Sequence, residues 1–187
     1  METWPDQALI RAALGGDLGA FDGLMRRYER LVFKVAVNLV RNPDSAFDVV
    51  QSVFLKAFQG LGQFRHEANV KTWLLRITYN ESIDWIRCRK HRDGSHGSLE
   101  DVAELLAVES NQEREILRRD DQALITRAMG QLNHRYRMAV DLRYFQGMGI
   151  PEIAQVIGCS EGVTKNMLFR SLRTLRESLL EMARGTK

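Results

Sequence analysis

The sequence predicts an all-α protein made of two small helical domains joined by a flexible linker. Apolar residues recur at the i, i+3, i+4 spacing of a helix along most of the chain, and no segment shows the alternation that predicts a strand. The pattern is broken by Asp93–Ser98, a run of turn-forming residues that is followed by an acidic stretch. We therefore assign residues 1–92 and 113–187 to the two domains and residues 93–112 to an acidic linker.

Composition restricts the kinds of protein that the chain can be. Its 187 residues are 44% apolar and 27% charged, which is typical of a globular protein, and the apolar runs are too short to span a bilayer. No basic segment followed by an apolar one opens the sequence, and two cysteines form no disulfide framework. We expect a cytoplasmic protein without membrane insertion.

Charge is distributed unevenly along the chain. Residues 1–92 hold 14 Lys and Arg against 10 Asp and Glu, residues 93–121 hold 3 against 9, and residues 122–187 hold 10 against 5. Two basic blocks separated by an acidic one indicate two modules that bind a polyanion, with a tether between them. An accidental bias of surface charge is the alternative.

Three helices are predicted before the glycines at positions 60 and 62. Asp6 and Asp17 are expected to cap the first two, which end near Leu14 and Arg41. The third begins after a break at Asn42–Asp44. One of its faces carries two polar residues and a leucine and is solvated by default, whereas its aromatic side is expected to be core. The first face comprises Asp48, Gln51 and Leu55, and the second Phe47, Val50, Phe54 and Phe58.

The segment from Phe64 to Arg92 interleaves aromatic and basic residues. A loop, His66–Lys71, leads into a long helix that ends in a cationic cluster. Rings that stack on bases, cations for phosphates and amides for base edges together hold single-stranded nucleic acid, and a flipped base needs a small pocket with an apolar wall. If the tryptophans are core instead, the basic end only complements the helix dipole. One helical face would carry Arg76, Asn80, Asp84 and Arg87, another Leu75, Tyr79, Ile83 and Ile86, and the pocket would adjoin Phe64, Trp73 and Ile77.

The C-terminal block is predicted to be a compact unit that includes a helix-turn-helix. One helix runs from Glu113 to about Met129, and another lies near His134–Phe145. Pro151 then starts a short helix, Gly158 ends it in the left-handed conformation, and Ser160 caps the next helix, which is basic. This is the layout of a DNA-binding motif, although a corner of two helices with a solvated basic face has the same pattern. Inward positions would be Met138, Leu142, Phe145, Ile153, Val156 and Ile157, and the cations Lys165, Arg170, Arg173 and Arg176.

Residues of both blocks follow the order found in one protein family. In the first block they are Gly16, Asp17, Ala20, Phe21, Tyr28, Asp48–Gln51, Phe54–Ala57, Phe64, Thr72–Leu74, Arg76, Ile77, Asn80, Asp84 and Arg87. In the second they are Arg137, Leu142, Glu152–Ala154, Gly158, Gly162, Lys165, Leu168, Arg170, Leu175 and Arg176. This series resembles the bacterial extracytoplasmic-function (ECF) sigma factors, the smallest promoter-recognition subunits of RNA polymerase. The resemblance covers nearly the whole chain and is weakest in the linker.

The resemblance implies a function and a set of site residues. Sigma domain 2 would occupy residues 1–92 and sigma domain 4 residues 113–187, and the chain would direct core RNA polymerase to promoters without being an enzyme. The β′ clamp of the polymerase would bind Asp48, Gln51, Phe54 and Leu55, and the second domain would lie near the β flap. The −10 element would be opened and held by Phe64, His66, Asn69, Lys71, Trp73, Arg76, Ile77, Asn80, Asp84, Arg87 and Arg89. The −35 element would be read by Ser160, Glu161, Gly162, Lys165, Asn166, Phe169, Arg170 and Arg173.

The chain also departs from the family pattern. The family has Thr then Val after the glycine of the recognition helix, whereas this chain has Val163 and then Thr164. Met167 and Leu172 stand where the family often has basic residues. Phe47 and Ser52 replace acidic residues near the polymerase-binding face. These departures predict altered binding to DNA and to the polymerase.

The sequence leaves other interpretations of the function open. A metal site is conceivable at Cys88, His91, His96 and Cys159, but the spacing lies outside the usual zinc patterns, so we expect no metal and no cofactor. A stand-alone helix-turn-helix regulator, or a sigma-like decoy that only binds an anti-sigma factor, would explain part of the chain. An anti-sigma factor is also an expected partner of a true sigma factor, because exposed docking faces invite a sequestering protein.

Overall fold

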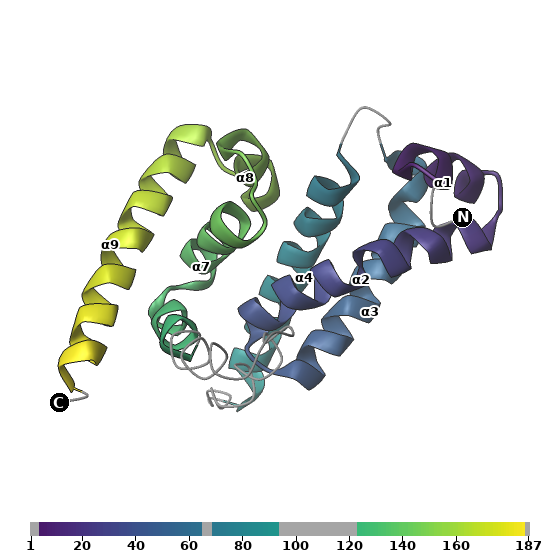
Figure 1. Cartoon of the computed structure of the whole chain (residues 1–187). Coiled ribbons are helices and arrows are strands. Elements are labelled where there is room, and N and C mark those ends of the chain that lie inside the picture. Colours follow the sequence, from purple (N-terminus) through teal and green to yellow (C-terminus); the bar gives the residue numbers. More distant parts are fainter. Residues whose placement is uncertain (1–3, 65–68, 94–122, 186–187) are drawn as a thin grey trace, which may run out of the picture.

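Helices are the only regular secondary structure in the residues that the structure, a computed structural model, describes: 4–64, 69–93 and 123–185. Figure 1 shows α9 along one edge of the molecule, α7 and α8 beside it, and α4 facing them from the N-terminal part. Helices α2 and α3 pack against α4, and α1 lies at the end of the molecule away from α9. The all-α prediction is confirmed for these residues. Most of the predicted linker lies outside them.

The N-terminal part consists of helices whose ends follow the predicted breaks. Asp17 accepts a hydrogen bond from the amide of Ala20 and caps α2, and Asn42 caps α3 through the amide of Ser45. Arg41, in the left-handed conformation, ends α2. The elements are α1 (Asp6–Leu14), α2 (Leu18–Val40), α3 (Pro43–Gly60), the 3-10 turn η1 (Leu61–Gln63) and α4 (Val70–Asp93).

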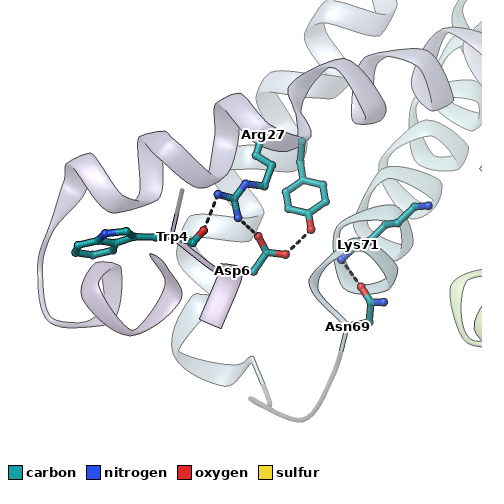
Figure 2. A network of polar contacts seen from close by, with 6 residues as sticks. Trp4, Asp6, Arg27, Asn69 and Lys71 are labelled. Atoms are coloured by element: carbon teal, nitrogen blue, oxygen red, sulfur yellow. Dashed lines mark hydrogen bonds and ion pairs between the residues drawn. The ribbon is translucent and has the colours of Figure 1, made fainter. Parts of the chain in front are cut away.

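Asp6 does not cap α1, contrary to the prediction. Pro5 occupies the cap position and makes no side-chain bond there, while Asp6 is the first residue of the helix. Its carboxylate instead binds Arg27 and accepts a hydrogen bond from Tyr28, and Arg27 also donates to the carbonyl of Trp4 (Figure 2). The side chain thus ties α1 to α2.

Two of the aromatic residues predicted as core in α3 are largely exposed. Val50 is buried as expected, but Phe47 is 54% exposed and Phe58 is 46% exposed. Each ring lies against one on α2, with centroid distances of 4.7 Å for Phe33–Phe47 and 5.1 Å for Phe21–Phe58. They therefore cover the edge of the core instead of filling it.

The C-terminal part forms the predicted helix-turn-helix. Gly158 has φ 72° and ends α8, and the hydroxyl of Ser160 accepts a hydrogen bond from the amide of Val163 at the start of α9. Glu152 closes the start of α8 by binding the amide of Gly149. The elements are a helical segment over residues 123–131, α7 (His134–Val140), the π-helical turn η2 (Asp141–Phe145), α8 (Ile150–Ile157) and α9 (Glu161–Gly185).

The π-helical turn corrects one prediction. Met138 and Leu142 are fully buried as expected, but Phe145 is 58% exposed. A π turn holds more residues than an α turn, so it rotates the positions that follow relative to an α-helical pattern. The spacing that pointed Phe145 inward therefore fails after Asp141.

The two parts share one apolar core. The predicted apolar face of α4, with Leu75, Tyr79 and Ile83, is buried in a single cluster with residues of the helix-turn-helix. From α2 the cluster takes Val35 and Leu39, and from the C-terminal part Met138, Ala139, Leu142, Met148, Ile153, Val156, Ile157, Met167 and Leu168. The structure therefore shows that this face is buried and that the second domain covers it.

Arg137 joins the two parts through backbone carbonyls. This buried side chain on α7 donates to the carbonyls of Asn38 and Leu39 at 3.2 and 3.3 Å, close to the end of α2. It also donates to the carbonyls of Met129, Gly130 and Leu132 in its own domain. Burial, and then the neighbouring Arg41, lower the pKa of Arg137 to about 10, so that it stays protonated at neutral pH. A cation is favourable at this place because the last carbonyls of a helix lack partners within the helix.

Asp141 is a buried carboxylate between the two parts. It is 1% exposed and accepts hydrogen bonds from the amides of Asn38 on α2, at 2.8 Å, and of Gln146, at 3.5 Å. Burial raises the pKa of Asp141 to about 6, although these two hydrogen bonds and the nearby Lys34 oppose the shift. Proton binding therefore favours the folded arrangement, and the charged form is unfavourable there.

The substitution Asp141→Asn is expected to stabilise the protein at neutral pH. The folded-state pKa of about 6 lies above the ordinary 3.8, so the contribution of Asp141 to stability is most favourable below pH 3.8 and is lost as pH rises through 6. At roughly 1.4 kcal/mol per pKa unit, the variant should gain about 1–3 kcal/mol at pH 7.5 and little at pH 4. Urea unfolding at several pH values measures the difference. Asp48→Asn, at an exposed site, is the control, and an equal gain for it would contradict the prediction.

Candidate nucleic-acid and polymerase interfaces

A cleft of about 810 Å³ runs along α4 and is bounded on its other side by the C-terminal part. Asn80, Asp84 and Arg87, all exposed, line it from α4, as predicted for one face of this helix. The opposite wall includes His134, Arg135 and Ile157. The cleft combines an amide, charged groups and aromatic surface, which is the chemistry that holds an unpaired nucleic-acid strand.

The aromatic end of the cleft is formed by Trp73 and Ile77. Both are half-buried and line the cleft together with Gly60 and Gln63. Phe64 packs against Trp73, with ring centroids 4.9 Å apart, but is only 6% exposed. The ring available to a base is therefore that of Trp73, and Phe64 supports it from behind. His66 lies outside the described residues.

Several of the predicted phosphate-binding cations are not gathered in the cleft. Lys71 belongs to the first turn of α4, and not to a loop as predicted; its amide donates to Asn69 (Figure 2) and its ammonium donates to the carbonyl of Gln146 at 2.8 Å. Arg76 lines a separate hollow with residues of α8 and the start of α9. Arg89 lies over the ring of Trp85, 5.1 Å from its centroid. Of these cations, only Arg87 shares the cleft with Asn80.

The predicted polymerase-binding face lies on the outer surface of α3. Asp48, Gln51 and Leu55 are exposed, whereas Phe54 is half-buried and packs against the core below them. The exposed rings of Phe47 and Phe58 flank this row on the same helix. Helical periodicity predicted both rings to be inside. The family's acidic residue at the position of Phe47 was a sign that this position is exposed.

The second helix of the helix-turn-helix presents its predicted DNA-reading residues to solvent. All eight of them are exposed: Ser160, Glu161, Gly162, Lys165, Asn166, Phe169, Arg170 and Arg173. Arg135, which the sequence analysis did not select, lines a hollow with Asn166 and Arg170. Its charge alone could not distinguish it from other surface arginines.

The exchanged pair Val163 and Thr164 has a clear structural consequence. Val163 is 49% exposed, while Thr164 is fully buried. The hydroxyl of Thr164 lies 3.1 Å from the carbonyl of Ser160, to which it donates, and 3.3 Å from the sulfur of Cys159. Thr164 thus satisfies its polar group within the turn, and the apolar group is displayed outside.

The described residues contain neither a cluster of metal ligands nor a helix that could span a membrane. In 4–64, 69–93 and 123–185 no three His, Cys, Asp or Glu side chains gather as metal ligands would; the side chain of His91 and all of His96 lie outside this description. Within the same ranges, no helix combines the length and the apolar character that a membrane span requires.

The geometry defines the class of this protein: an all-α protein in which a helix-turn-helix packs on a four-helix N-terminal part. Residues 24–92 match the family model of sigma-70 region 2, and residues 122–175 match that of sigma-70 region 4. The chain is 31% identical over 186 residues to the RNA polymerase sigma-H factor of Pseudomonas aeruginosa, with 96% of both chains covered. It is 32% identical over 174 residues to the ECF RNA polymerase sigma factor SigM of Mycobacterium tuberculosis, with 93% of this chain and 84% of the relative covered. The chain belongs to the ECF sigma factors of the sigma-70 family.

Solved structures share the fold. A chain in the structure of CnrH in complex with the cytosolic domain of CnrY matches with a TM-score of 0.68 and 24% identity over 95% of this chain and 97% of that one. RpoE in complex with the anti-sigma factor NepR from Bartonella quintana matches with a TM-score of 0.69 and 24% identity over 85% and 96%. The predicted family and fold class are therefore confirmed.

Proposed function

We propose that the chain is a sigma factor that joins core RNA polymerase and directs it to start transcription at particular promoters. The observation that carries this proposal is the presence, in one chain, of a helix-turn-helix with an exposed basic helix and of the cleft lined by Trp73, Asn80 and Arg87. A stand-alone helix-turn-helix regulator would use α8 and α9 but would leave this cleft without a role. We assign sigma domain 2 to residues 1–92, the linker to residues 93–112 and sigma domain 4 to residues 113–187.

Reconstitution with core RNA polymerase tests the proposal. Polymerase carrying the purified chain should start transcripts at defined positions in a library of bacterial genomic DNA, and sequencing of the RNA 5′ ends locates these positions. Core polymerase alone is the control. A chain that binds the −35 DNA without joining the polymerase would be a stand-alone regulator, and one that joins an anti-sigma factor but never the polymerase would be a decoy.

The −10 element is assigned to the α4 cleft. Trp73 and Ile77 supply the apolar wall for a flipped base, Asn80 offers an amide to a base edge, and Arg87 is available to a phosphate. The phosphate backbone on either side of the flipped base is assigned to Asn69, Lys71, Arg76 and Arg89.

Because several cations take part, binding of the holoenzyme to a promoter should weaken steeply between roughly 50 and 200 mM salt.

The outer face of α3 is assigned to the β′ clamp of the polymerase. Replacing Leu55 by Asp places a charge in the middle of this face and is expected to weaken binding to core polymerase by roughly tenfold or more, since hot spots lie near interface centres. Leu18→Asp makes the same chemical change at an exposed site in the first turn of α2, where an acid suits the helix dipole. Fluorescence titration of labelled chain with core polymerase compares them, and equal affinities would contradict the assignment.

The −35 element is assigned to the exposed face of α9. Removing Lys165 and Arg170 together is expected to abolish protection of this element, because each lost base contact costs ~1–3 kcal/mol. DNase footprinting of the holoenzyme measures the protection. Arg184→Ala removes a cation from the last turn of the same helix and should leave the footprint unchanged. A normal footprint of the double variant would refute the assignment.

The proposed cellular location and regulation of the protein follow from its proposed function. A promoter-recognition subunit acts in the bacterial cytoplasm and is not itself an enzyme, and its C-terminal domain would lie near the β flap. The exposed apolar residues on α3 and α9 offer docking surfaces when the polymerase is absent. We therefore include an anti-sigma factor among the partners.

A further inference from the structure

We propose that Val163 sets part of the promoter specificity of this chain, by packing its methyl groups against the C5-methyl group of a thymine in the −35 element. Val163 is not among the residues that the family resemblance assigns to this element, and it stands where the family has a threonine. The inference rests on the proposed function, since it concerns the helix that is assigned to −35 DNA.

Val163 stands among residues that are assigned to base reading. It is the third residue of α9 and is 49% exposed. The first residues of the second helix of a helix-turn-helix are those that contact base edges in the major groove. Val163 also lines a hollow of about 350 Å³ together with Asn166 and Arg170, which follow it at helical spacing on the same side of α9. DNA that contacts Asn166 and Arg170 therefore also lies beside Val163.

The register of α9 keeps the side chain of Val163 at the surface. Thr164, the next residue, is fully buried; its hydroxyl donates to the carbonyl of Ser160 at 3.1 Å and lies 3.3 Å from the sulfur of Cys159. Consecutive residues of an α-helix are turned by about 100° around its axis, so Val163 lies on a different side of the helix from Thr164. A valine in a helix also has one strongly preferred χ1 rotamer. Its methyl groups are therefore held in place before DNA binds.

A valine has few favourable partners on DNA. Its methyl groups form no hydrogen bonds and do not bind phosphates. The base edges in the major groove present hydrogen-bond donors and acceptors, except that thymine also presents a C5-methyl group, which apolar side chains contact. Packing against a base edge without that methyl would bury a polar group that loses its hydrogen bonds to water, which is unfavourable. Val163 therefore favours a thymine at the position that it faces.

The same reasoning separates this chain from relatives that have threonine at this position. A threonine there carries a hydroxyl group, which can form a hydrogen bond with a phosphate or a base edge. Val163 offers a second methyl group in place of that hydroxyl, so the preferred base pair should differ from theirs. The alternative is an exposed valine without a DNA contact, since single apolar residues are common on protein surfaces.

The experiment compares thymine with deoxyuridine, which lacks only the C5-methyl group. The holoenzyme first selects tightly bound promoters from a library that is randomised over the −35 element, and a thymine should recur at one position of one strand. Each thymine of the selected element is then replaced in turn. Fluorescence anisotropy at one salt concentration measures binding of the labelled promoter to the holoenzyme. At one thymine the replacement should weaken binding by roughly three- to fivefold, the effect of removing one buried methyl-sized group.

Variants of the full chain show whether Val163 is the partner of that methyl group. With Val163→Ser, which carries no methyl group, the thymine and deoxyuridine promoters should bind equally. Val163→Thr keeps one methyl group and should show a smaller difference than the wild type. Leu180→Ser removes an equally exposed side chain, also at 49%, near the end of the same helix and should keep the full difference. Circular dichroism verifies that each variant keeps its helix content.

The outcomes separate this inference from the proposed function. Two results would overturn the inference: no thymine whose replacement weakens binding, or a loss that Val163→Ser leaves unchanged. In either case, normal protection of the −35 element by the holoenzyme would show that α9 reads this element without the methyl contact. A holoenzyme that binds promoters without protecting the −35 element would instead refute the assignment of α9, and this inference with it.

Discussion

Replacing Asn80 by alanine is expected to weaken promoter opening strongly while leaving the binding of core polymerase intact. Asn80 is exposed in the cleft, where its amide lies beside the apolar wall formed by Trp73 and Ile77. A flipped base is held by hydrogen bonds to its edge as well as by stacking, and one such contact is worth ~1–3 kcal/mol. Opening should therefore fall by roughly ten- to a hundredfold. The polymerase-binding face is on α3 and is not altered by this change.

The measurement is the permanganate reactivity of unpaired thymines in the −10 region, recorded alongside the affinity for core polymerase. Gln59→Ala removes an exposed amide from α3 and should leave the reactivity unchanged. Asn80→Asp keeps the size of the side chain but loses its donors, and it should resemble the alanine variant if donation matters. Loss of polymerase binding by the alanine variant would place Asn80 in the docking surface instead.

Replacing Arg137 by methionine is expected to destabilise the folded chain by about 3–5 kcal/mol, because several buried carbonyls lose a charged hydrogen-bond donor at once. The buried guanidinium donates to five backbone carbonyls, two of which belong to the other domain. Methionine fills much of the same space but satisfies none of these oxygens, and an unsatisfied buried acceptor costs ~1–3 kcal/mol.

Urea unfolding followed by circular dichroism measures this effect. Arg127→Met, at an exposed site in the helical segment over residues 123–131, is the matched control and should change the free energy of unfolding by less than about 0.5 kcal/mol. Similar unfolding curves for the two variants would show that Arg137 does not hold the domains. A transition that splits into two steps for Arg137→Met would show that the domains have lost their coupling.

The sequence predicted correctly the helix ends that depend on contacts between residues a few positions apart. The caps Asp17 and Ser160 and the left-handed Gly158 stand where they are predicted, because each satisfies or frees backbone groups within a few positions. Phe145 escaped prediction because one π turn changes the register of a helix whose residues look regular. Asp6 was misread because its partners Arg27 and Tyr28 lie on the next helix.

The candidate site could be predicted only in part for a related reason. Periodicity predicted that Leu75, Tyr79 and Ile83 share one face of the helix, but it could not show that α8 covers this face. The same limit applies to Lys71 and Arg76, whose charges suggested phosphates and whose present neighbours are groups of the other domain. The family resemblance supplied the roles of individual residues, and these roles stay predictions.

The way Arg137 reaches across the domain boundary bears on chimeric sigma factors. Its acceptors on α2 are main-chain oxygens, which every helix end provides whatever its side chains. The contact between Asn38 and Asp141, in contrast, depends on which residue stands at each position. A hybrid that takes its N-terminal half from a relative would thus keep the arginine anchorage, whereas the contact to Asp141 would survive only where the relative also offers a donor at position 38. Such hybrids should therefore differ chiefly in how firmly their halves are held together.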